Sequence, residues 1–175
     1  MTAMGILNLT NQASSCPVCL RLVCKTLGVC VAPHDGLTEA AREIGEDIIS
    51  AYAINGEKVA IFYDSSIKDY TSTVRFEVAK QLAHFLKFKK ETHFGNFGMC
   101  DEIYDFVAEL LIPKDALRCV INRLIMPEIQ SLARIFDVPD NLVRYRLSKL
   151  GIKDDIVGYN ASEIDFYMKW WLLFS

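Results

Sequence analysis

The sequence has no apolar run of about 18 residues, the length that a membrane-spanning helix requires. Its first 16 residues contain no lysine or arginine, whereas a secretory signal begins with basic residues, so we expect a cytoplasmic protein without a membrane segment. Basic residues are not in excess, because 19 Lys and Arg stand against 22 Asp and Glu, which does not favour nucleic-acid binding by the whole chain. Repeats, low-complexity segments and long linkers are missing as well. What the 175 residues do contain is 51% hydrophobic side chains, enough for a packed globular core.

Four of the six cysteines lie close together in the sequence, at Cys16, Cys19, Cys24 and Cys30. A structural zinc site usually takes its ligands from two close pairs separated by a loop, and the second pair is spread out here. We therefore interpret these cysteines as small apolar side chains with free thiols. The sequence assigns them no further role.

Apolar periodicity predicts an α+β fold in which helices surround a small antiparallel sheet. Two β-prone runs flank Asn55-Gly56, a strong hairpin signal, and predict strands at about 47–54 and 57–63. From Thr71 to Phe88 the period becomes helical, with one apolar stripe through Val74, Val78, Leu82 and Phe85. Further helices are expected from Ser14 or Ser15 to Leu27, over 37–45, over 100–113, as two or three short helices up to Leu150, and over 162–173, where Phe166 and a tryptophan should be buried.

Three stretches, in this order, carry a resemblance to a known family. They are "STVRFEVAKQLAHFLKF" (72–88), "DEIYDFVAELLIP" (101–113) and "IQSLARIFDVPDNLVRYRLSKLGI" (129–152). They resemble the "qRFtlAHELgHyLlH", "EanrFAaeLLmP" and closing "LAerFgVSe.al..RL..LGl" segments of the ImmA/IrrE metallopeptidases, and the resemblance covers roughly 37–152. It implies a zincin-like core in 1–113 and a helical, helix-turn-helix-like subdomain in 114–175 packed on that core.

The same resemblance implies a zinc site whose chemistry is degenerate in this chain. Family members hold zinc with two histidines one helical turn apart and an acidic residue on the next helix, and a glutamate beside the first histidine acts as the base. The corresponding positions here are Lys80 for the first histidine, Gln81 for the base, His84 for the second histidine and Glu102 for the acidic ligand. An ammonium offers a metal no lone pair, so we expect no active catalytic residue and no bound cofactor. His84 and Glu102 then remain as vestigial metal positions, and Lys80 is expected to pair with Glu102.

Members of this family often cut or bind helix-turn-helix repressors of mobile elements and stress responses. The resemblance therefore implies an inactive metallopeptidase-like protein that binds such a repressor or another regulator. One alternative is an active zinc endopeptidase with a metal site rebuilt from other side chains, such as His34, His93 or Cys100. Another is a DNA-binding regulator that uses a helix-turn-helix at 129–151, with these residues on its second helix: Arg144, Tyr145, Arg146 and Lys149.

Overall fold

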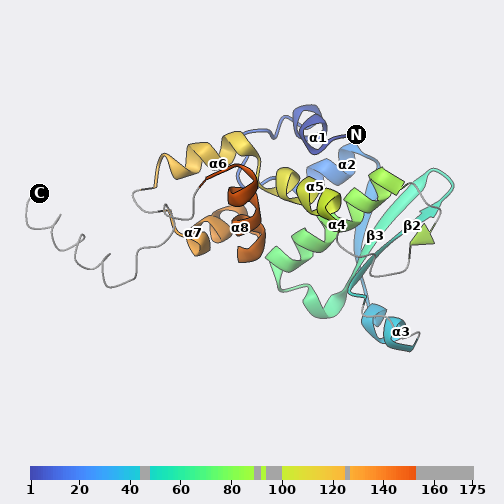
Figure 1. The fold of residues 1–175 in the computed structure, drawn as a ribbon. Coiled ribbons are helices and arrows are strands. Elements are labelled where there is room, and N and C mark those ends of the chain that lie inside the picture. Colours follow the sequence, from blue (N-terminus) through green and yellow to red (C-terminus); the bar gives the residue numbers. More distant parts are fainter. Residues whose placement is uncertain (44–47, 89–91, 94–99, 125–126, 153–175) are drawn as a thin grey trace, which may run out of the picture.

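The computed structural model describes residues 1–43, 48–88, 92–93, 100–124 and 127–152 (Figure 1). Within these ranges the chain forms eight α-helices, a small sheet and one short 3-10 helix. In chain order the elements are α1 (Ala3–Leu9), α2 (Leu20–Thr26), β1 (Val29–His34), α3 (Leu37–Glu43), β2 (Ser50–Asn55), β3 (Lys58–Asp64), η1 (Ser65–Ile67), α4 (Thr71–Phe88), β4 (Thr92–His93), α5 (Asp101–Leu111), α6 (Lys114–Ile121), α7 (Ile129–Phe136) and α8 (Asp140–Lys149). The predicted α+β class is confirmed.

The sheet is mixed, so the prediction of an antiparallel sheet was wrong in part. Its strand order is β1-β3-β2-β4, with three strands of six or seven residues and a two-residue β4. The predicted hairpin is present: β2 and β3 pair antiparallel, and Gly56 begins the turn with φ +60°, which favours glycine. β1 pairs parallel to β3, in register from Val29 opposite Val59 to His34 opposite Asp64. The short run of β1 carries no pattern that specifies strand direction, which depends on how the chain crosses over through α3 and β2.

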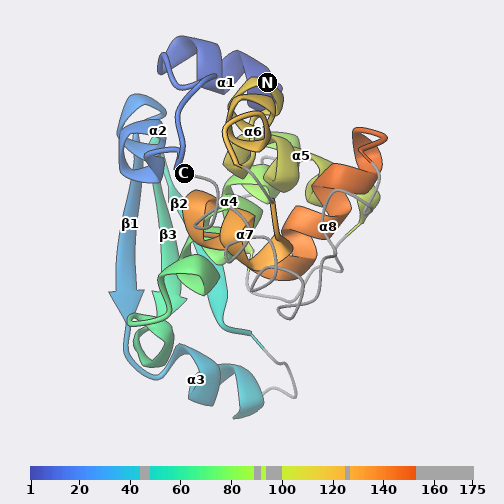
Figure 2. The ribbon, with the colours of Figure 1, turned by 90° about the vertical axis from the view of Figure 1, so that its left-hand side faces the viewer.

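The helix α4 lies at the centre of the molecule. It packs against β2 and β3 and against α5, so protein surrounds its middle. Figure 2 shows the strands on one side of the molecule, with α4, α5, α7 and α8 stacked on the other. One hydrophobic cluster runs through these layers, from Ile6 in α1 through Leu82 in α4 to Leu132 in α7 and Leu147 in α8. The predicted division of the chain at residue 113 stays a prediction.

The N-terminal segment differs most from the sequence-based expectation. α1 was not predicted, and the next helix begins at Leu20 rather than at Ser14 or Ser15. The side chain of Gln12 explains the late start, because it accepts a hydrogen bond from the backbone N–H of Cys19 at 2.5 Å and donates one to the Cys19 carbonyl at 3.2 Å. These bonds offer the backbone an alternative to helical pairing. The predicted end at Gly28 is confirmed, since α2 ends at Thr26 and Gly28 has φ +69°.

Two further expectations concern the C-terminal helix and membrane-spanning segments. The predicted helix over 162–173 lies outside the described residues. In the part of the chain that the structure does describe, no helix combines the length and the apolar character needed to cross a membrane.

Candidate functional site

The middle of α4 is buried on every side, including its polar positions. All eight residues from 77 to 84 are buried, because the sheet covers one flank of the helix and α5 covers the other. Four of the eight are polar or ionisable, namely Glu77, Lys80, Gln81 and His84. Spacings of three, four and seven residues place these side chains along one helix face. Burial of this many polar groups requires internal partners, which makes this face the candidate site.

The first partner pair joins Lys80 to Glu77. The Lys80 Nζ lies 2.5 Å from the Glu77 carboxylate, one helical turn back along α4, and both side chains are nearly inaccessible to solvent. A buried carboxylate without a counter-charge is strongly unfavourable, so each charge depends on the other. Lys80 thus neutralises a carboxylate of its own helix.

Ser50 connects this pair to the sheet. Its hydroxyl, at the start of β2, donates a hydrogen bond to the Glu77 carboxylate. The side-chain amide of Gln81 donates to the same hydroxyl at 2.8 Å and to the Ser50 carbonyl at 3.0 Å. Amide, hydroxyl, carboxylate and ammonium therefore form one continuous network between α4 and β2. We call these four residues, Ser50, Glu77, Lys80 and Gln81, the buried polar network.

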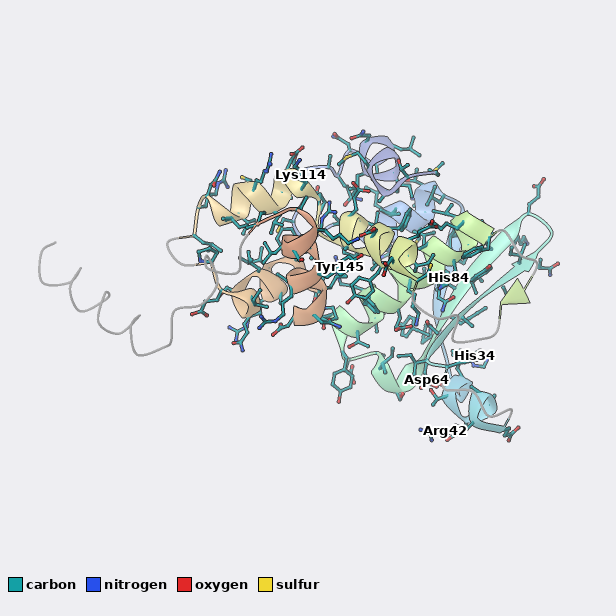
Figure 3. The ribbon with its side chains drawn as sticks, viewed as in Figure 1. His34, Arg42, Asp64, His84, Lys114 and Tyr145 are labelled. Carbon is teal, nitrogen blue, oxygen red and sulfur yellow. The ribbon has the colours of Figure 1, made fainter. Side chains whose placement is uncertain are left out.

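His84 lies one turn beyond Lys80 on the same helix. Its side chain is buried, and its ring stacks on Phe88 with ring centroids 5.8 Å apart. Figure 3 shows it between α4 and the sheet, apart from the cluster of His34, Asp64 and Arg42 near α3. His84 is therefore an interior side chain of α4, and its role as a vestigial metal position stays a prediction.

Glu102 does not join this group, and the expected Lys80–Glu102 ion pair was wrong. The Glu102 carboxylate is 76% exposed and forms an ion pair with Lys87, near the end of α4. The pairing differs because Glu77 stands on the same helix as Lys80 and within its reach, whereas Glu102 stands at the solvent-facing start of α5. The two vestigial metal positions therefore lie in different environments, His84 in the interior and Glu102 at the surface.

The residues present do not fit a zinc ion at this position. A zinc site needs at least three converging donors, and Lys80 holds its ammonium against Glu77 where the family places a histidine. Within the described ranges, no group of three His, Cys, Asp or Glu side chains is placed to hold a metal ion. The rebuilt site considered above finds no support: His34 packs edge-on against Phe62, and Cys100 is exposed before α5. The side chain of His93 lies outside the described part.

The two helices expected over 129–151 are present as α7 and α8, and two of the four candidate DNA-contacting side chains, Tyr145 and Arg146, are partly or fully buried. The turn contains Asp137 in a left-handed conformation with φ 51°. The Arg146 guanidinium is buried and donates to the Ile112 carbonyl at 3.1 Å. Tyr145 and Lys149 both contact Asp105 on α5. Figure 3 places Tyr145 between α8 and α5. Of the four candidate residues, Arg144 is exposed without such a contact, so this face favours packing over DNA binding.

The contact between α5 and α8 predicts a measurable pH dependence. The hydrogen bond from Tyr145 is the largest cause that lowers the pKa of the Asp105 carboxyl below its ordinary value of 3.8, and Lys149 adds to it. Because the folded pKa lies below the unfolded one, the stabilisation is fully present above pH 3.8 and disappears as the pH falls through the folded pKa. We expect Asp105→Asn to lower the free energy of unfolding by about 0.5–1 kcal/mol at neutral pH, since the Asp105 side chain is 48% exposed.

Urea unfolding of wild type and Asp105→Asn at neutral and acid pH measures this difference, with Glu57→Gln in the β2–β3 turn as the control. The difference should vanish in acid for Asp105→Asn and stay near zero throughout for Glu57→Gln. A loss that persists unchanged into acid would contradict the assignment.

Sequence reasoning identified Lys80, Gln81 and His84 as a group but missed Glu77 and Ser50. Glu77 had a usable signal, because it precedes Lys80 by three residues and Gln81 by four and therefore shares their helix face. Ser50 had none, since its place in the buried polar network depends on the tertiary contact between β2 and α4.

The chain matches no family model, no curated protein and no solved structure. The ImmA/IrrE resemblance therefore rests on the three sequence stretches quoted above and stays a prediction. Independently of the family, Glu77, Lys80 and Gln81 of α4 form the buried polar network together with Ser50 of β2.

Proposed function

We propose that this chain is a catalytically inactive ImmA/IrrE-like protein with a zincin-like core, and that it acts by binding a helix-turn-helix repressor or another regulator. The observation that carries the loss of catalysis is the buried polar network. Lys80 and Gln81 stand where the family has its first zinc ligand and its base, and both are committed to Glu77 and Ser50. Neither side chain can supply the missing chemistry, because an ammonium does not coordinate a metal and an amide does not accept a proton at neutral pH.

The order and packing of the elements support the family assignment. The β2–β3 hairpin leads into α4, and α5 packs along α4, as expected if 72–88 and 101–113 correspond to the two site helices of the family. The interior position of His84 fits its expected place. The binding role is carried over by analogy with the family, whose members bind such repressors, because a fold by itself does not determine a function.

We expect a complex without cleavage when the purified chain is mixed with a helix-turn-helix repressor encoded beside it. Light scattering reports the complex, and intact mass spectrometry reports cleavage, each with added zinc and with a chelator. The expected result is a complex whose amount is unaffected by zinc or chelator, with the repressor at full mass.

Two outcomes would contradict the proposal in different ways. Repressor fragments that disappear with the chelator would identify an active metallopeptidase. An intact repressor that forms no complex would remove the binding role while leaving the loss of catalysis in place.

A further inference from the structure

The strand β1 forms an outer edge of the sheet, and within the described residues no strand pairs with its outer side. The strand order places β1 at one end, and Figure 2 shows it along the outside of the molecule. Its sequence, VCVAPH, contains no acidic residue, lysine or arginine, and Val31 is 39% exposed. Edge strands are normally protected by charged side chains or proline or by a covering segment, and Pro33 serves only the far end of β1. The part of β1 before Pro33 therefore lacks such protection, and another segment could pack against it.

An open groove of about 830 Å³ lies beside this edge, between α2, β1 and α4. Its walls are largely apolar and include Val29, Val31, Val74 and Val78. The exposed cations Arg21 and Lys25 of α2 also line the groove. No acidic residue of the described chain lines it.

A third cation in the groove is already neutralised. The guanidinium of Arg75 lies 3.5 Å from the Asp137 carboxylate and donates to the Asp137 carbonyl at 2.9 Å. Arg21 and Lys25 make no ion pair within the described residues. The groove therefore fits a segment that combines apolar side chains with carboxylates.

We propose that residues 153–175 of this same chain cover the groove. This segment contains the run "MKWWLLF" at 168–174, which is apolar except for Lys169. It carries four acidic side chains, Asp154, Asp155, Glu163 and Asp165, against two lysines. Exposed to solvent, an apolar run of this size would form a hydrophobic patch that favours association or aggregation. Glu163 and Asp165 complement Arg21 and Lys25, whereas a second copy docked edge to edge would bring the same cations together.

The segment is also long enough to reach the groove from α8. Its 23 residues span up to about 75 Å when extended, and a domain of this size is about 30–40 Å across. The inference is independent of the proposed function, since it concerns only the groove and this chain's own C-terminal residues.

The cysteines of the protein provide the test, because two exposed thiols lie in the groove and two lie elsewhere. Cys19 and Cys30 line the groove, whereas Cys100 precedes α5 and Cys119 lies on α6. Alkylation of the full chain with iodoacetamide at neutral pH, mapped by peptide mass spectrometry, gives a rate for each thiol. Cys24 also lines the groove but is itself buried, so it reports on unfolding: burial raises the pKa of its thiol to about 11, and it reacts slowly while the fold persists.

We expect Cys30 to react at least about tenfold faster in Glu163→Lys/Asp165→Lys and in Trp170→Ser/Trp171→Ser than in wild type, a factor equivalent to about 1.4 kcal/mol of docking. Cys19 should follow, and Cys100, Cys119 and Cys24 should keep their rates. The groove-side reversal Arg21→Glu/Lys25→Glu should also expose Cys30. Combining it with Glu163→Lys/Asp165→Lys should restore protection, because the opposite charges meet again.

Three results would overturn the proposal. Equal Cys30 rates in wild type and both tail variants would mean that the segment does not cover the groove. Protection that grows with protein concentration would mean that the groove binds a second copy. In the third result, the variant that combines both charge reversals has a Cys30 rate as high as each reversal alone, while Cys24 still reacts slowly. The charges of the segment and the groove would then not pair, and the argument for this segment as the occupant would fail.

Discussion

Replacing Lys80 with methionine is expected to lower the free energy of unfolding by about 3–5 kcal/mol, the usual loss when one partner of a buried ion pair is removed. The substitution keeps most of the apolar stem but removes the ammonium that lies 2.5 Å from the Glu77 carboxylate. Glu77 is buried, so its charge would then be left with the Ser50 hydroxyl alone. This loss is a large part of the roughly 5–15 kcal/mol that stabilises a typical domain.

The double variant Glu77→Gln/Lys80→Met should recover most of that loss, because it removes the orphaned carboxylate together with its partner. Urea unfolding at neutral pH measures both variants. Lys87→Met is the matched control: it breaks the ion pair with Glu102 at the surface and should cost less than about 1 kcal/mol. If the double variant were as unstable as Lys80→Met, Lys80 and Glu77 would not depend on each other.

If the resemblance to the ImmA/IrrE family holds, placing that family's residues in this chain with Lys80→His and Gln81→Glu together is expected to make the stability depend on zinc. Without metal this variant should be less stable than wild type, because Glu77 loses its ammonium and a second carboxylate is added one turn away on the same face. The new histidine would stand four residues before His84, a spacing that lets two imidazoles reach one ion. Glu102 stands at the position of the family's acidic ligand, and breaking its largely exposed pair with Lys87 should cost less than about 1 kcal/mol.

We expect added zinc to stabilise this variant by about 2.7 kcal/mol when the free metal is a hundredfold above its dissociation constant. Thermal unfolding with zinc and with a chelator measures the gain, and elemental analysis counts the bound metal. The same variant carrying His84→Gln should lose the response, and wild type should show none. A variant with intact His84 that gains nothing from zinc would mean that positions 80 and 84 do not correspond to the ligand pair of the family.

The apolar pattern of the sequence determined the local elements of the site. The stripe through Val74, Val78, Leu82 and Phe85 predicted a helix from Thr71 to Phe88, and α4 has these bounds. Asn55-Gly56 predicted the hairpin, because few residues other than glycine adopt the positive φ that such a turn requires. The apolar segment before Pro113 likewise predicted α5. Each of these signals acts over a few residues, so it can be read without knowledge of the fold.

Tertiary structure decided which polar groups meet. The helix spacing puts Glu77 within reach of Lys80, and the burial of α4 between the sheet and α5 brings these two charges together away from solvent. Ser50 enters the network because β2 runs beside α4, a contact between residues about 30 positions apart. The parallel pairing of β1 with β3 depends on the same long-range arrangement. Sequence alone therefore identified the helix and its altered residues, whereas their partners followed from packing, because side chains distant in sequence acquire neighbours only when the layers close around them.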